Sequence, residues 1–166
     1  MLYRFISYIG FIFSSTNQHG VHSPFIYNFI TKCLYGKSKY KGRKTIKTLL
    51  KSITYFNAVH ISVLPEDGTL IELIRESFPQ TKFNAPSDLI YMGTPCATQF
   101  TQILKGKSYH NDTILLIDKI YGNKKNTQEW EAFKQHEKVT VSVDMFSCGA
   151  LFFRKEQAKE HFKIRI

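Results

Sequence analysis

Asp118 is the acidic residue best placed for chemistry, because it ends a continuous apolar run, Thr113–Asp118 (TILLID). A carboxylate at the end of a buried strand can take part in acid–base chemistry, and His110 and Tyr121 are the nearby residues that could act with it. A carboxylate in this position can also have a structural role alone. Both interpretations of Asp118 remain open from the sequence.

Histidine and cysteine side chains offer weaker signals. His19 and His22 have an H-x-x-H spacing, but a zinc site needs three or four ligands and no third is suggested, so we predict no metal. Cys96 lies just inside an expected helix N-terminus, where a thiol pKa can be lowered, and it also fits an apolar helix face. With Cys33 and Cys148 it makes three scattered cysteines, which indicates free thiols in a reducing compartment.

Basic side chains are concentrated in the first third of the chain. Residues 1–65 contain nine Lys or Arg and no Asp or Glu, although the net charge of the whole chain is only +10. Such a field attracts polyanions with little sequence preference, so we expect salt-sensitive binding to RNA or to an anionic membrane surface. The alternative is a solvated basic face without a partner. Seven of the nine form the predicted anion-binding set: Lys37, Lys39, Lys41, Arg43, Lys44, Lys47 and Lys51.

The length and composition favour one globular domain. A chain of 166 residues suits a single core, and 43% apolar with 22% charged residues is ordinary for a soluble protein. The first thirteen residues place apolar side chains at helical spacing, but they are too few to span a bilayer, and no clean signal-peptide cleavage pattern follows. We expect this segment to be either a helix that covers the core or an interfacial amphipathic helix.

Periodicity beyond this first helix predicts helices and strands in alternation. Ser23 and Pro24 are typical of a helix start, and Gly36 of its end. Further helices are expected at 44–56, 67–78, from Thr94–Pro95 onward, and from Asn126, in a capping box with Glu129, to about His136. Strands are expected at 58–64, 88–92, 113–118, 139–145 and 149–154.

This alternation predicts an α/β fold. We expect a doubly wound, mostly parallel sheet of about five strands, with a C-terminal antiparallel hairpin and N-terminal helices that cap one end or edge of the sheet. Residues 1–56 would be a basic helical segment and residues 57–166 the α/β domain, together one compact unit. The nine residues 79–87 are too few for further strands, so strand 58–64 should pair in parallel with 88–92, and 113–118 should flank the latter.

Several segments resemble a Bacteroidetes group of class I S-adenosylmethionine-dependent methyltransferases. They include His19–Phe25 (HGVHSPF), Trp130–His136 (WEAFKQH), Phe152–Gln157 (FFRKEQ) and His161–Ile166 (HFKIRI). With their neighbours they cover residues 1–56 and about 87–166. The resemblance implies a shortened methyltransferase-like sheet, S-adenosylmethionine as cofactor, and methyl transfer to a small molecule or an RNA.

The resemblance also implies which residues would contact the cofactor. Gly68 lies in the loop after the first strand, Gly93 follows the strand 88–92, and Asp118 ends the strand 113–118. In the family, glycines let the backbone approach the cofactor, and acids face its charged groups and its ribose hydroxyls. Gly68, Gly93 and Asp118 are therefore the expected cofactor-binding residues.

The chain departs from the family pattern at the same places. Val63 stands where an acid is expected, and Pro65, which has no N–H, stands where the first glycine is expected. The short connection 79–87 lacks the strands that hold adenosine, and Lys119 replaces an acidic neighbour. We therefore expect S-adenosylmethionine to bind no more tightly than about millimolar, a free energy near −4 kcal/mol.

Two functional hypotheses follow. The first is a divergent S-adenosylmethionine-dependent methyltransferase with a degraded cofactor site. The second is a non-catalytic methyltransferase-fold protein whose basic N-terminal helices bind an anionic partner, either RNA or a membrane surface. In both we expect a cytoplasmic protein, either free or peripheral at the membrane.

Overall fold

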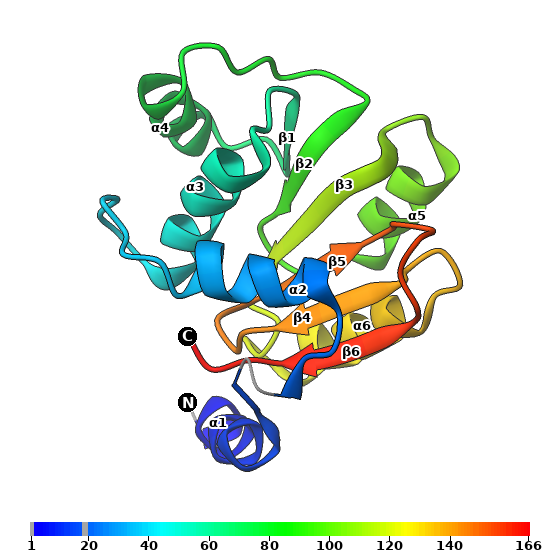
Figure 1. The fold of residues 1–166 in the computed structure, drawn as a ribbon. Helices are drawn as coiled ribbons and strands as arrows, with labels where there is room; N and C mark the ends of the chain where they lie inside the picture. The colour runs from blue at the N-terminus through cyan, green and yellow to red at the C-terminus, as the bar shows by residue number, and fades with distance from the viewer. Residues whose placement is uncertain (1, 18–19) are drawn as a thin grey trace.

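Residues 2–17 and 20–166 are described by the computed structural model, and in this part of the chain six strands form one sheet in the order β1-β2-β3-β5-β4-β6 (Figure 1). Strand β5 runs antiparallel to both neighbours, and the other neighbouring pairs are parallel. The α/β class and the mixed sheet are therefore confirmed. The strands are β1 (Ile61–Leu64), β2 (Ser87–Met92), β3 (Tyr109–Asp118), β4 (Val141–Asp144), β5 (Cys148–Phe152) and β6 (Glu160–Lys163).

The predicted pairing of the first three strands is confirmed. β1 pairs in parallel with β2, and β3 lies on the other side of β2. The predicted connection 79–87 contains no further strand: Ser87 begins β2, and residues 79–86 form one isolated bridge, between Lys82 and His60. The predicted number of about five strands was too low, because β6 pairs in parallel with β4. Its side chains are half-buried or exposed, so no apolar alternation marks it in the sequence.

Helices cover both faces of the sheet (Figure 1). Apolar side chains of α2, η2, α3 and α4 share one core with alternate strand residues such as Leu89 and Tyr91, and those of α5 and α6 share a second core with Ile90 and Met92. Burial on both faces explains why the strands read as continuous apolar runs. The helices are α1 (Leu2–Ser14), α2 (Pro24–Asn28), its π-helical continuation η2 (Phe29–Leu34), α3 (Lys44–Phe56), α4 (Gly68–Ser77), α5 (Ala97–Lys105) and α6 (Lys124–Gln135).

The position predicted for the N-terminal helices was wrong for α2 and α3. These helices lie across one face of the sheet rather than at an end or edge, and Ile26, Phe29 and Leu49 are fully buried there. The physical reason is that this sheet face is wide and apolar, and α4 alone does not cover it. The first helix, α1, lies at one end of the sheet, beside the turn that joins β4 to β5.

Local capping explains where the helices begin. The Ser23 hydroxyl accepts a hydrogen bond from the Ile26 N–H, as predicted. The capping box predicted at Asn126 was wrong, because Asn123 is the N-cap of α6 and accepts from the Asn126 N–H at 2.9 Å. The Asn126 amide instead donates to the Lys119 carbonyl, and this bond ties α6 to the segment after β3. Helix α5 likewise begins two residues after the predicted Pro95.

Candidate anion-binding site

A cavity of about 400 Å³ opens at the carboxyl ends of β3 and β4, and we call it the basic pocket. Ligands of open α/β sheets bind at this end of the strands. Within the described residues, four cationic side chains line the pocket: Arg4 from α1, Arg43 and Lys44 from the start of α3, and Lys119 from the segment after β3. Asp118 is the one acid among these described lining residues.

Asp118 is buried and fully engaged within the protein. Its carboxylate accepts hydrogen bonds from the Thr45 hydroxyl at 2.8 Å, the Tyr91 hydroxyl at 3.1 Å and the Lys119 N–H at 2.8 Å. The Arg43 guanidinium lies 3.4 Å from the same group. A carboxylate offers about four acceptor positions, and three of them are used by these hydrogen bonds. Asp118 therefore joins the start of α3 to β2 and β3.

The rim of the pocket is held by two residues with left-handed backbones. Lys119 has φ +56° and Phe146 has φ +63°. This conformation costs a residue with a Cβ roughly 1–2 kcal/mol, so it persists where other bonds impose it. The Lys119 N–H donates to Asp118 and to the Ser147 carbonyl, and the Phe146 N–H donates to the Asp144 carboxylate at 2.9 Å. Strained backbone of this kind is typical of functional sites.

Tyr121 belongs to a second buried acid rather than to Asp118. Its hydroxyl donates to the Asp144 carboxylate at 2.6 Å. Burial raises the pKa of Asp144, and the hydrogen bonds from Tyr121 and from the Phe146 N–H oppose that rise. The Tyr121 ring also stacks on Phe146, with centroids 5.0 Å apart. Tyr121 is therefore not the acid–base partner that the sequence offered for Asp118.

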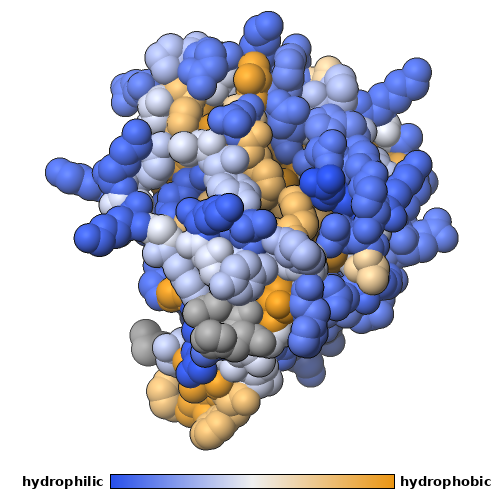
Figure 2. Space-filling view, viewed as in Figure 1, coloured by the Kyte–Doolittle hydropathy of each residue, from blue (hydrophilic) through white to orange (hydrophobic). Residues whose placement is uncertain are grey.

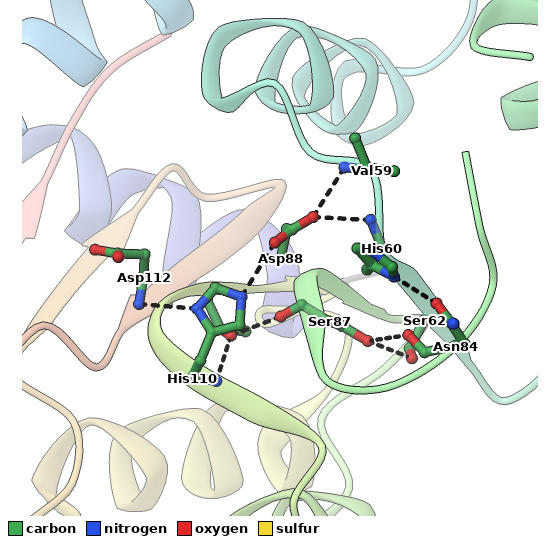
Figure 3. A network of polar contacts seen from close by, with 9 residues as sticks. Val59, His60, Ser62, Asn84, Ser87, Asp88, His110 and Asp112 are labelled. Atoms are coloured by element: carbon green, nitrogen blue, oxygen red, sulfur yellow. Dashed lines mark hydrogen bonds and ion pairs between the residues drawn. The ribbon is translucent and has the colours of Figure 1, made fainter. Parts of the chain in front are cut away.

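His110, the other offered partner, lies at the opposite end of β3. On the paired strand β2, the positions opposite Tyr109 and Ile117 are Ser87 and Met92, five residues or about 17 Å apart. The His110 ring instead contacts Asp88 at 3.1 Å, in the polar network that joins the starts of β1, β2 and β3 (Figure 3). Asp88 also accepts from the Val59 and His60 N–H groups at 2.9 and 2.8 Å. Partial burial opposes its ionisation, but these hydrogen bonds outweigh burial and lower the pKa of Asp88.

The structure does not bring together the three residues expected to contact the cofactor. Asp118 lines the basic pocket, whereas Gly68 is the exposed first residue of α4 and Gly93 follows β2. The Gly93 N–H donates to the Leu64 carbonyl at 2.8 Å, so a backbone bond joins the carboxyl ends of β1 and β2. A Cβ on Gly93 would lie 3.8 Å from the Pro65 ring.

These contacts do not fit S-adenosylmethionine. The Gly93 N–H already donates to the Leu64 carbonyl, at the point where the family places its cofactor loop. Pro65 has no N–H and supplies no donor there. Asp118 already accepts three internal hydrogen bonds and pairs with the Arg43 guanidinium, so its carboxylate is largely occupied within the protein.

The seven predicted anion-binding residues lie in the segment before α3 and on α3 itself, and they do not line one cavity. Arg43 and Lys44 line the basic pocket. Three others line a second cavity of about 290 Å³ beside Tyr40 and Tyr55, and the remaining two line neither of these cavities. The three are Lys37, Lys39 and Lys51, and the two are Lys41 and Lys47.

Sequence reasoning missed two cations of the basic pocket, Arg4 and Lys119. Lys119 carried a signal, because it directly follows the acid at the end of a predicted strand. Arg4 carried a weaker one, as the single charged residue in the first helix. Neither could be grouped with Arg43 from the sequence, since the fold brings them together from three separate segments.

The metal and thiol candidates do not form sites. His19 is outside the described residues, so the H-x-x-H pair is not placed. In the described part of the chain, no three His, Cys, Asp or Glu side chains cluster closely enough to hold a metal. Burial raises the pKa of Cys33 to about 11 and that of Cys148 to about 12. Cys96 is half-buried at the N-cap of α5 and packs against the second core.

Comparisons of the chain with protein-family models, with curated protein sequences and with solved structures give no match.

Proposed function

We propose that this chain is a non-catalytic, divergent methyltransferase-fold protein that binds an anionic group in the basic pocket. The observation that carries the proposal is the state of Asp118. Its carboxylate is used internally, by Thr45, Tyr91, Lys119 and Arg43, while cations surround the open space beside it. The acid that would serve a cofactor thus acts as a structural anchor, and the pocket is left with a positive field.

The charges in the pocket favour a phosphate-like ligand. Arg43 is paired with Asp118, whereas the side chains of Arg4 and Lys119 form no ion pair within the described residues. Lys44 donates to the main-chain oxygen of Ile166 at 2.9 Å, which orients its ammonium group. Guanidinium and ammonium groups form their strongest hydrogen bonds with phosphate and carboxylate oxygens. A volume of about 400 Å³ lies in the range of small-ligand sites.

The methyltransferase-like part of the proposal rests on the resemblance and on the agreement of the fold with it. Parallel strands with one antiparallel strand near the C-terminal edge, and helices on both faces, are what the resemblance implies. A divergent but active S-adenosylmethionine-dependent methyltransferase is the competing function. Those two functions differ in whether the cofactor binds.

The test is a calorimetric titration of inorganic pyrophosphate into the full chain. We expect binding that weakens as salt is raised, because the attraction is electrostatic. The double substitution Arg4→Gln and Lys119→Gln should weaken it at least tenfold. The matched control removes two exposed charges elsewhere, Lys105→Gln with Lys107→Gln, and should change the affinity less than twofold. Equal weakening by both pairs, or no pyrophosphate binding in the unmodified chain, would contradict the proposal.

A further inference from the structure

Helix α1 turns an apolar face toward the outside of the protein. The exposed fractions are 72% for Leu2, 61% for Phe5, 59% for Ile6, 42% for Ile9 and 87% for Phe13. At 100° per residue these five side chains fall within an arc of about 100° on the helix. Figure 2 shows the apolar surface at the bottom of the molecule, where Figure 1 places α1.

Polar side chains of α1 face the protein instead. Arg4 lines the basic pocket, and the Ser14 hydroxyl accepts from the Lys163 ammonium at 3.2 Å. Phe11 is the one buried residue among the described positions of the helix. A helix that covers a core has the reverse arrangement, with its apolar stripe inward. Of the two interpretations drawn from the sequence, the interfacial helix is the one that this orientation favours.

Contacts between α1 and the turn that joins β4 to β5 hold the apolar face of the helix outward. Phe146 contacts Phe11 and Tyr8, with ring centroids 5.5 and 4.9 Å apart, and the Arg4 guanidinium lies 5.8 Å from the same ring. Phe146 is itself one of the two left-handed residues of the pocket rim. The side of α1 that faces the protein is therefore packed against the turn, and its apolar side remains exposed.

Cations lie beside α1, on the protein side of its open apolar face. Arg4, Lys44 and Lys119 line the basic pocket, Arg165 lines a neighbouring cavity that Lys44 also lines, and Lys163 contacts Ser14 at the end of the helix. A cavity of about 150 Å³ between α1 and Arg165 has no acidic side chain among its described lining residues. An apolar stripe bordered by cations complements a surface of anionic headgroups over hydrocarbon.

We infer that the anionic partner is a lipid surface, into which α1 inserts its apolar face while the surrounding cations contact the headgroups. This inference rests on the proposed anion binding. Thirteen helical residues span about 20 Å, so α1 would lie in the interface rather than cross a hydrocarbon layer of about 30 Å. Likewise, no helix in the described ranges has the length and apolarity to cross a membrane.

The alternative occupants of this face fit less well. An RNA would use the cations but leave Phe5, Ile9 and Phe13 in water. A second copy of the chain would cover the apolar face, but it would bring two sets of like charges together at the same interface. A lipid surface satisfies both the apolar face and the charges at once.

The experiment uses the full chain with large unilamellar vesicles of phosphatidylglycerol and phosphatidylcholine, and with vesicles of phosphatidylcholine alone. We expect salt-sensitive co-sedimentation with the anionic vesicles and at least tenfold weaker binding to the neutral ones. The substitutions Phe5→Ser with Ile9→Ser should reduce binding to anionic vesicles at least tenfold. The matched control, Tyr27→Ser with Leu73→Ser, removes two exposed apolar side chains outside α1 and should leave binding within twofold.

An insertion probe separates the membrane from the alternatives. Trp130 is fully buried, so the substitution Phe13→Trp adds a reporter on the exposed face, whose emission should shift to the blue with anionic vesicles. A shift with RNA but not with vesicles would overturn the inference. So would an unmodified chain that does not bind vesicles but forms a dimer, if the substitutions Phe5→Ser with Ile9→Ser abolish that dimer. Phe5 and Ile9 are outside the basic pocket, so the two proposals can fail separately. Pyrophosphate binding without vesicle binding would refute the lipid surface as the partner and leave the proposed anion binding standing.

Discussion

Replacing Asp118 with alanine should destabilise the protein by about 3–4 kcal/mol. The change would leave the buried Tyr91 hydroxyl without its acceptor and would leave the buried Thr45 hydroxyl only the Ser147 carbonyl, at 3.4 Å. A buried donor left unsatisfied costs about 1–3 kcal/mol, and the lost hydrogen bonds from Thr45 and from the Lys119 N–H add to this.

Urea unfolding followed through the single, fully buried Trp130 measures this cost. Asp118→Asn keeps the shape and one acceptor oxygen, so it should cost less, about 1–2 kcal/mol. The matched control, Glu76→Ala, removes an exposed carboxylate from α4 and should change the free energy of unfolding by less than about 0.5 kcal/mol. If Asp118→Ala costs less than about 1 kcal/mol, Asp118 is not an anchor, and its carboxylate is available for a ligand.

Three further predictions concern packing, pH and thiol chemistry. Gly149→Ala should cost at least about 2 kcal/mol in thermal unfolding, because the new Cβ would lie 2.4 Å from the ring of buried Trp130; a smaller cost would mean that this core yields easily. Asp88→Asn should reduce the free energy of unfolding at pH 7 by about 1 kcal/mol, and the difference from the unmodified chain should shrink below about pH 4. The reason is that the pKa of Asp88 is lowered in the folded protein, so its ionised form stabilises the fold at higher pH and this stabilisation is lost as pH falls. A difference that is constant with pH would contradict this. Cys96 should react with a thiol reagent in the folded protein, whereas the two buried thiols, with pKa values raised to about 11 and about 12, should react only on unfolding; rapid modification of all three would refute the assigned burial.

The pairing of the first three strands could be predicted because each is an apolar run and the connection 79–87 is short. Strand β6 could not, since its half-exposed residues pair through the backbone and leave no pattern. The periodicity of residues 2–13 showed which side chains share a face of α1. This periodicity could not show where that face points, because Phe146, whose ring contacts orient the helix, is more than 130 residues away in the chain.

The candidate site was predictable only in part. Asp118 was identified by its place at the end of a strand, and its location at the carboxyl edge follows from the fold. Its role depends on Thr45 and Tyr91, which are 73 and 27 residues away along the chain, and local pattern carries no information on such contacts. The basic cluster was visible as composition, but its division between two cavities depends on how α3 packs.

We propose that the internal contacts of Asp118 and of Gly93 prevent this fold from binding S-adenosylmethionine, and that the basic pocket binds an anion instead. A calorimetric titration of S-adenosylmethionine into the full chain tests this directly. We expect binding no tighter than about millimolar, a free energy near −4 kcal/mol. A micromolar dissociation constant would contradict it, because the cofactor would then have to displace the hydrogen bonds that hold Asp118 to α3 or join β1 to β2.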